Sequence, residues 1–119
     1  MIPKKKLDDA LTTMGKKYLR SPYKEQWTPA RPTTGYCYVV SEVVYHYFAP
    51  KGSKSYVLKT GDNSTHWFLK SPAGEVIDLT ADQFDKTVPY EKAKPHAFLT
   101  KTISKRGKVL SKLLGIPSK

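Results

Sequence analysis

Cysteine is almost absent from this chain, which has only Cys37 among its 119 residues. One thiol cannot form an internal disulfide. Together with three scattered histidines it also supplies no ligand pair at the spacing of a structural zinc site. We therefore expect a free thiol in a reducing compartment, no bound metal and no other cofactor.

Long apolar runs are absent as well. No stretch approaches the roughly 20 residues of a membrane span. The basic start of the chain continues into Leu7-Asp8-Asp9 rather than into the apolar core of a secretory signal. Phosphate-binding glycine loops and dinucleotide motifs are also missing. These absences predict a soluble, cytoplasmic protein with no transmembrane segment.

Acidic residues are few: 10 Asp and Glu stand against 21 Lys and Arg, which gives a formal net charge of +11. The excess lies at the two ends. Residues 1–30 carry seven basic and three acidic side chains, residues 31–90 carry six of each, and residues 91–119 carry eight and one. Such a charge favours partners of opposite sign. We expect an acidic protein or peptide substrate, or weak contact of the basic termini with nucleic acid or another polyanion.

The composition predicts a folded chain, because 39% hydrophobic and 12% aromatic residues exceed what disordered segments contain. The length suits a single domain over residues 1–119. We place its core at about residues 20–100, between a basic N-terminal helix at 4–19 and a basic C-terminal tail at 101–119.

Hydrophobic periodicity predicts an α+β arrangement. Apolar residues recur at helical spacing over residues 4–19 and over Cys37–Phe48, and the second segment has few charges, as a buried helix would. Three short strands then form an antiparallel meander, with turns at residues 61–64 and 71–74: Ser55–Thr60, Thr65–Lys70 and Glu75–Leu79.

The rest of the chain shows weaker signals. Thr80 and Gln83 fit a capping box, which predicts a short helix starting at Thr80. Residues 88–100, which include two prolines, are expected to be extended. The tail from Ile103 to Ile116 mixes leucines with basic residues and is expected to pack on the domain as a terminal helix.

Cys37 lies at the predicted start of the buried helix, with Thr33 or Thr34 as the expected cap. Free N–H groups and the helix dipole favour an anion there, and a thiolate is such an anion. A nucleophilic thiol also needs a nearby base. His46 lies nine residues along the same helix, about 13 Å away and half a turn out of phase, so it cannot serve. His66 is the candidate base, with His96 in reserve.

The turn between the last two predicted strands determines whether Asp78 can orient His66. Ser71-Pro72-Ala73-Gly74 suits a type I turn followed by a left-handed residue, which sets Ser71 opposite Glu75. His66 and Asp78 then share one face as diagonal neighbours. A four-residue loop would instead place them on opposite faces.

Three segments carry a resemblance to a known family. They are WTPARPTTGYC ending at Cys37, HWF starting at His66, and EVIDLTADQF containing Asp78. They resemble the W-x-P…P…G-Q-C segment, the H-[YW]-[WF] strand and the I-D-L-T-x-x-Q-F stretch of the YunG-like proteins. The likeness covers residues 27–85, about half of the chain.

More distantly, the order of cysteine on a helix, histidine on a strand and aspartate on the next strand is similar to papain-like, NlpC-type and transglutaminase-like proteins. This resemblance implies an α+β papain-like fold in which the nucleophile helix packs on a small antiparallel sheet. It also implies a catalytic triad of Cys37 as nucleophile, His66 as general base and acid, and Asp78 as the orienting group.

The pocket around such a triad would include Tyr36, Gln26, Trp27 and Trp67. The YunG-like pattern has Gln where this chain has Tyr36. A side-chain donor to the oxyanion would therefore have to be the Tyr36 hydroxyl, aimed inward, or the Gln26 amide. The Cys37 backbone N–H remains available in either case.

Two functions from different classes follow. The first is a cysteine hydrolase or acyl transferase of the thiol peptidase or amidase type, acting on an amide, isopeptide or thioester bond of an acidic or polyanion-associated substrate. The second is a non-catalytic basic binding module for nucleic acid or an acidic protein. In that module Tyr18, Tyr23 and Trp27 would provide stacking surfaces among basic side chains.

Overall fold

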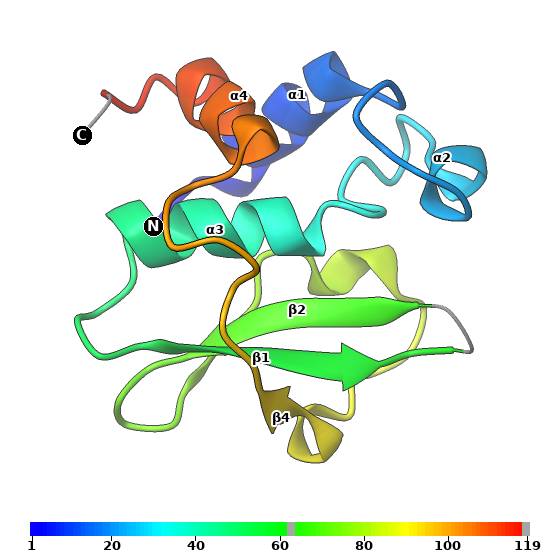
Figure 1. Ribbon diagram of the computed structural model, residues 1–119. Coiled ribbons are helices and arrows are strands. Elements are labelled where there is room, and N and C mark those ends of the chain that lie inside the picture. The colour runs from blue at the N-terminus through cyan, green and yellow to red at the C-terminus, as the bar shows by residue number, and fades with distance from the viewer. Residues whose placement is uncertain (62–63, 118–119) are drawn as a thin grey trace.

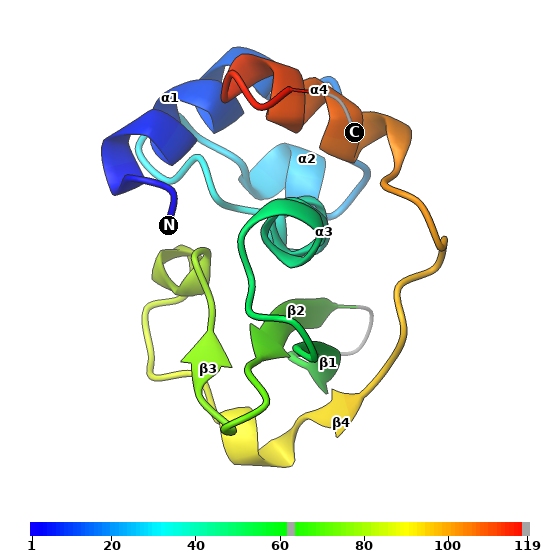
Figure 2. The same ribbon diagram turned by 90° about the vertical axis from the view of Figure 1, so that its left-hand side faces the viewer.

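The computed structural model describes residues 1–61 and 64–117 as an α+β protein in three layers. Helix α3 lies between a small antiparallel sheet and a layer formed by helices α1 and α4, as the two views in Figures 1 and 2 show. The α-helices are α1 (Lys4–Met14), α2 (Tyr23–Gln26), α3 (Cys37–Tyr47) and α4 (Lys105–Leu113), and the strands are β1 (Lys54–Lys59), β2 (Thr65–Lys70), β3 (Val76–Ile77) and β4 (Lys94–Pro95).

Helix α1 starts where the periodicity predicts but is shorter than residues 4–19. It ends at Met14 because Gly15 adopts a left-handed φ of 62°, which turns the chain away from the helix axis. Leu7, Leu11 and Met14 are at most 1% exposed and form the face that packs into the core. Tyr18, expected on the same face, lies in the loop beyond the helix.

Helix α3 is confirmed to within one residue of its predicted range. It is covered on two sides, by the sheet and by α4, which explains why its valines occupy more than one face. The predicted threonine cap is wrong: Tyr36 occupies the cap position and makes no side-chain cap. The Thr33 hydroxyl instead donates to Asp82 Oδ1 at 2.9 Å, and the Thr34 hydroxyl donates to the Arg31 carbonyl.

The sheet has the strand order β3-β2-β1-β4, with antiparallel pairing throughout. Strand β2 is confirmed residue for residue, β1 is shifted by one residue, and β3 shrinks to two residues. The turn predicted between β1 and β2 includes positions 62 and 63, which lie outside the described residues.

The register between β2 and β3 is the predicted one. Leu69 pairs with Ile77, and the Ser71 N–H donates to the Glu75 carbonyl at 2.9 Å. Gly74 at φ 87° is the left-handed residue that this turn requires. The same register sets position 68 opposite position 78, so residues 66 and 78 lie on one face.

The chain after β3 only partly matches its predictions. A 3-10 turn, η1 (Ala81–Gln83), starts at the predicted place, but the Thr80 hydroxyl does not cap it. The stretch 88–100 is not uniformly extended, because the 3-10 turn η2 (Tyr90–Lys92) precedes strand β4, which pairs with β1.

Helix α4 confirms the predicted packing of the tail. A buried carboxylate, Glu42 of α3, accepts hydrogen bonds from the Ser104 N–H (3.1 Å) and the Ser104 hydroxyl (2.5 Å), and so holds the start of α4 against α3. Gly107 permits this approach, since a Cβ there would lie 3.1 Å from Glu42 Oε1 as well as 2.5 Å from the Ile103 side chain. Among the residues described, none of the helices combines the length and apolar character needed to cross a membrane.

Candidate active site

Cys37 is the first residue of α3 and its thiol is free. The first intrahelical bond runs from the Val40 N–H to the Tyr36 carbonyl (2.9 Å), so the Cys37 N–H has no partner within the helix. The side chain is 7% exposed, and its Sγ lies 3.8 Å from the carbonyl oxygen of Thr65, the first residue of β2. The packing of α3 on β2 therefore places the thiol beside the strand that carries His66.

The loop before Cys37 is held by contacts from distant parts of the chain. The Gly35 N–H donates to the Gln83 side-chain carbonyl at 3.3 Å. Gly35 has a left-handed φ of 78°, and an added Cβ would lie 2.7 Å from the Tyr23 side chain. Tyr23 in turn uses its hydroxyl to accept from the Thr65 N–H at 3.2 Å. These contacts fix the helix start against β2.

His66 is fully buried in the middle of the site. Its Nε2 lies 2.7 Å from Asp78 Oδ2, which is the diagonal contact that the turn predicts. Its other ring nitrogen, Nδ1, is also buried but has no hydrogen-bond partner among the described residues. A buried polar atom left without a partner is uncommon in folded proteins and marks a candidate functional position.

Hydrogen bonds fill both oxygens of the Asp78 carboxylate. The Thr80 N–H and hydroxyl donate to Oδ1 at 3.1 and 3.3 Å, while the Tyr90 hydroxyl donates to Oδ2 at 2.7 Å, beside His66. The carboxylate is thus fixed in orientation, and so is the imidazole that it contacts.

Electrostatics favour a charged imidazole. Burial is the largest single effect on His66 and lowers its pKa, but the hydrogen bond and charge of Asp78, together with the neighbouring Cys37, raise that pKa from 6.5 to about 9. For Asp78, burial raises the pKa, but the contacts with His66, Tyr90 and Thr80 outweigh burial and lower it. His66 and Asp78 therefore form a buried ion pair at neutral pH.

A cavity of about 820 Å³ opens beside Cys37. The loop after α1, the start of α4 and the strand β2 all contribute to its walls, and Tyr38 and Trp67 line it together with Cys37. The ring centroids of Tyr38 and Trp67 lie 4.9 Å apart in an edge-to-face contact, so this wall is aromatic. The cavity gives a ligand a route to the thiol.

The structure brings only some of the predicted pocket residues to this cavity. Trp67 lines it, whereas Tyr36 is fully buried and its hydroxyl donates to the Gly15 carbonyl at 2.5 Å, away from the thiol. Gln26 is exposed on α2 and is not among the cavity residues. Trp27 is 6% exposed, and its indole N–H donates to the Pro32 carbonyl (2.9 Å) within the core.

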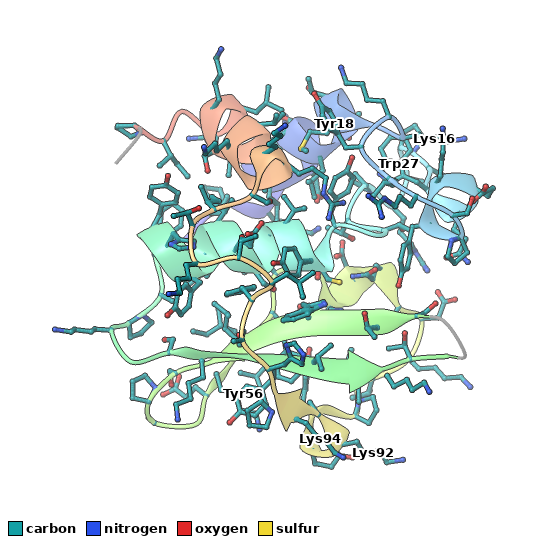
Figure 3. The ribbon with its side chains drawn as sticks, in the orientation of Figure 1. Lys16, Tyr18, Trp27, Tyr56, Lys92 and Lys94 are labelled. Carbon is teal, nitrogen blue, oxygen red and sulfur yellow. The ribbon has the colours of Figure 1, made fainter. Side chains whose placement is uncertain are left out.

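The burial of Trp27 also bears on the stacking surface expected of a nucleic-acid module. Tyr18 and Tyr23 remain partly exposed, but Trp27 packs in the main hydrophobic core and presents no open ring face. In Figure 3 Lys16 points outward from the loop near Tyr18. The three aromatic residues therefore do not form one exposed platform.

Sequence reasoning missed Tyr90, Thr80 and Tyr23 as contributors to the site. Thr80 had a usable signal, since an Asp two residues before a residue with a free N–H is the pattern of an Asx turn. Tyr90 and Tyr23 had none, because each reaches the site from a segment without periodicity. In the described part of the chain, no three or more His, Cys, Asp or Glu side chains are arranged so that together they could hold a metal ion.

These features define an α+β protein with a buried cysteine, histidine and aspartate constellation at a helix start. Comparison with protein-family models gives a match to the YunG protein family over residues 3–114. Because the match spans nearly the whole chain, the protein belongs to the YunG family. No curated protein and no solved structure matches the chain.

Proposed function

We propose that this protein is a cysteine hydrolase or acyl transferase that acts on an amide, isopeptide or thioester bond of an acidic substrate. Cys37 is the nucleophile, His66 the general base and acid, and Asp78 the group that orients the imidazole. The observation that carries the proposal is His66 itself: its Nε2 is bonded to Asp78, and its buried Nδ1 is unpartnered next to Cys37.

The arrangement of elements supports a place among the papain-like folds. In the papain-like order, a helix that begins with the cysteine packs on an antiparallel sheet, and the sheet supplies histidine and then aspartate from consecutive strands. Here α3 packs on β2, His66 is on β2, and Asp78 directly follows β3. The proposed relationship to papain-like folds rests on the order of the elements, and the proposed chemistry rests on the geometry of the site.

The reaction begins from a thiolate–imidazolium pair, in which His66 Nδ1 already holds the proton of the Cys37 thiol. The sulfur attacks the substrate carbonyl, and a tetrahedral oxyanion forms. The oxyanion collapses to an acyl-thioester on Cys37 as the imidazolium returns the proton to the departing amine or thiol. Water, or a second amine, then attacks the thioester with His66 again as base, and Cys37 is regenerated.

The oxyanion needs hydrogen-bond donors. The Cys37 N–H is one, since it has no partner within α3. A second is the Tyr23 hydroxyl: it accepts from the Thr65 N–H, and among the described residues its own hydrogen has only a 3.4 Å contact, with the Thr65 carbonyl. Cys37 Sγ approaches the same carbonyl, so this hydroxyl lies on the thiol side of the cavity.

Alkylation of Cys37 by iodoacetamide tests the proposal without knowledge of the substrate. The rate is measured by mass spectrometry between about pH 5 and pH 9. We expect rapid labelling near pH 7, because the imidazolium of His66 stabilises the thiolate. His66→Ala should slow labelling at that pH by at least about tenfold.

The matched control is His46→Ala, which removes an imidazole from the same helix nine residues further on. It should label like the wild type. A labelling midpoint near pH 8.5, the value of an ordinary thiol, that His66→Ala leaves unchanged would overturn the proposal.

A further inference from the structure

The cavity beside Cys37 is strongly basic. Four of its lining side chains are Lys17, Arg20, Lys105 and Arg106, and none of the described residues that line it is acidic. They come from the loop after α1 and from the start of α4, two segments that are far apart in sequence. The tertiary fold, rather than a local run of lysines, therefore assembles this cluster.

These four charges have no acidic partner among the described residues. Lys4, Lys5 and Arg31 are each paired with an aspartate elsewhere on the surface. In the cavity, Arg106 donates to the Tyr18 carbonyl at 3.2 Å, which orients its guanidinium without neutralising it. The nearby carboxylate of Glu42 is buried and accepts from Ser104.

We infer that the cavity is an anion site that binds a carboxylate or phosphate group on the acyl substrate of Cys37. This inference rests on the proposed function, since it names a feature of the substrate for the same thiol. Four unpaired positive charges around one concave surface attract an anion more strongly than the dispersed lysines of the remaining surface.

The rest of the cavity restricts the substrate further. Tyr38 and Trp67 give it an aromatic wall, and Leu99, which is 75% exposed, lies on its lining. The Tyr38 hydroxyl accepts from the Leu99 N–H at 2.8 Å, which holds the 97–101 segment at the edge of the cavity. The substrate class is thus an acyl compound with an apolar portion and an anionic group.

Two alkylating reagents of nearly equal size test the anion site, because iodoacetate carries a carboxylate and iodoacetamide does not. Both react with Cys37, and the ratio of their rates cancels the reactivity of the thiol itself. Relative to the same chain unfolded in urea, we expect the iodoacetate-to-iodoacetamide ratio of the folded protein to be at least about fivefold higher.

The double variant Arg20→Glu with Lys105→Glu should remove this preference, since both side chains are exposed and neither makes a hydrogen bond or ion pair with another described residue. The matched control is Lys92→Glu with Lys94→Glu. It changes net charge equally, but its sites lie on η2 and on the edge strand β4, away from the cavity (Figure 3). The control should retain the high ratio.

In the unmodified protein, raising NaCl to about 0.5 M should slow iodoacetate and leave iodoacetamide unaffected, which tests the site without any variant. A ratio no higher than that of the unfolded chain, or an equal loss in both double variants, would overturn the inference. A high iodoacetate-to-iodoacetamide ratio combined with labelling of Cys37 that His66→Ala does not slow would instead contradict the proposed function. The two failures are therefore distinguishable.

Discussion

The substitution Asp78→Asn tests the electrostatic core of the site. Folding raises the pKa of His66 from 6.5 to about 9, a shift that corresponds to about 3 kcal/mol of unfolding free energy. Because the folded pKa is the higher one, this stabilisation is fully present below about pH 6.5. It is lost as the pH rises through about 9.

Asparagine keeps the size of Asp78 but removes the charge that holds the imidazolium. Burial, the largest single effect on His66, is then opposed by Cys37 alone, so the pKa of His66 should fall below its wild-type value of about 9. We therefore expect the wild type to lose more stability than the Asp78→Asn variant between pH 6.5 and pH 10, by up to about 3 kcal/mol.

Two assays measure this difference: NMR titration of the His66 ring gives its pKa directly, and urea unfolding at each pH gives the free energy. Asp85→Asn is the control, because Asp85 pairs with Arg31 on the surface. It should leave the His66 titration unchanged. A His66 pKa at or below 6.5 in the wild type, or one that Asp78→Asn does not alter, would refute the reasoning.

Three further predictions concern the supports of the site. Tyr90→Phe removes a donor to the buried Asp78 carboxylate and should cost about 2 kcal/mol of unfolding free energy in urea; no loss would contradict the hydrogen bond. At Gly35, φ is 78° and an added Cβ would lie 2.7 Å from the Tyr23 side chain, so Gly35→Ala should cost more than about 2 kcal/mol of unfolding free energy. Gly74→Ala should cost about 1 kcal/mol, because an added Cβ there meets open space. Equal losses in the two thermal or urea melts would contradict the packing argument. Glu42→Ala should detach the start of α4, seen as amide exchange at least about tenfold faster in that helix and unchanged in α3.

The sequence predicts the elements with local signals. The valines of α3 and the leucines of α1 have helical periodicity, and the turn Ser71–Gly74 determines the β2–β3 register. The prediction failed where tertiary contacts outweighed local preference: Thr80 fits a capping box, but its hydroxyl bonds Asp78 instead.

The site was only partly predictable for the same reason. The His66–Asp78 contact follows from strand register, which a turn type can fix. The Tyr36 hydroxyl was one of two candidate side-chain oxyanion donors, but its direction depends on where α1 packs, and it bonds Gly15. The basic cavity joins the loop after α1 to the start of α4, and nothing local in either segment indicates that they meet.

Direct detection of an acyl-enzyme tests the central claim most directly. The protein is mixed with p-nitrophenyl acetate near neutral pH, quenched in acid, digested and analysed by mass spectrometry. The account predicts one acetyl group on Cys37, formed faster than on the unfolded chain and lost again with time, and at least about tenfold slower formation in His66→Ala. No acetyl group on Cys37, or formation at the same rate in His66→Ala, would contradict it.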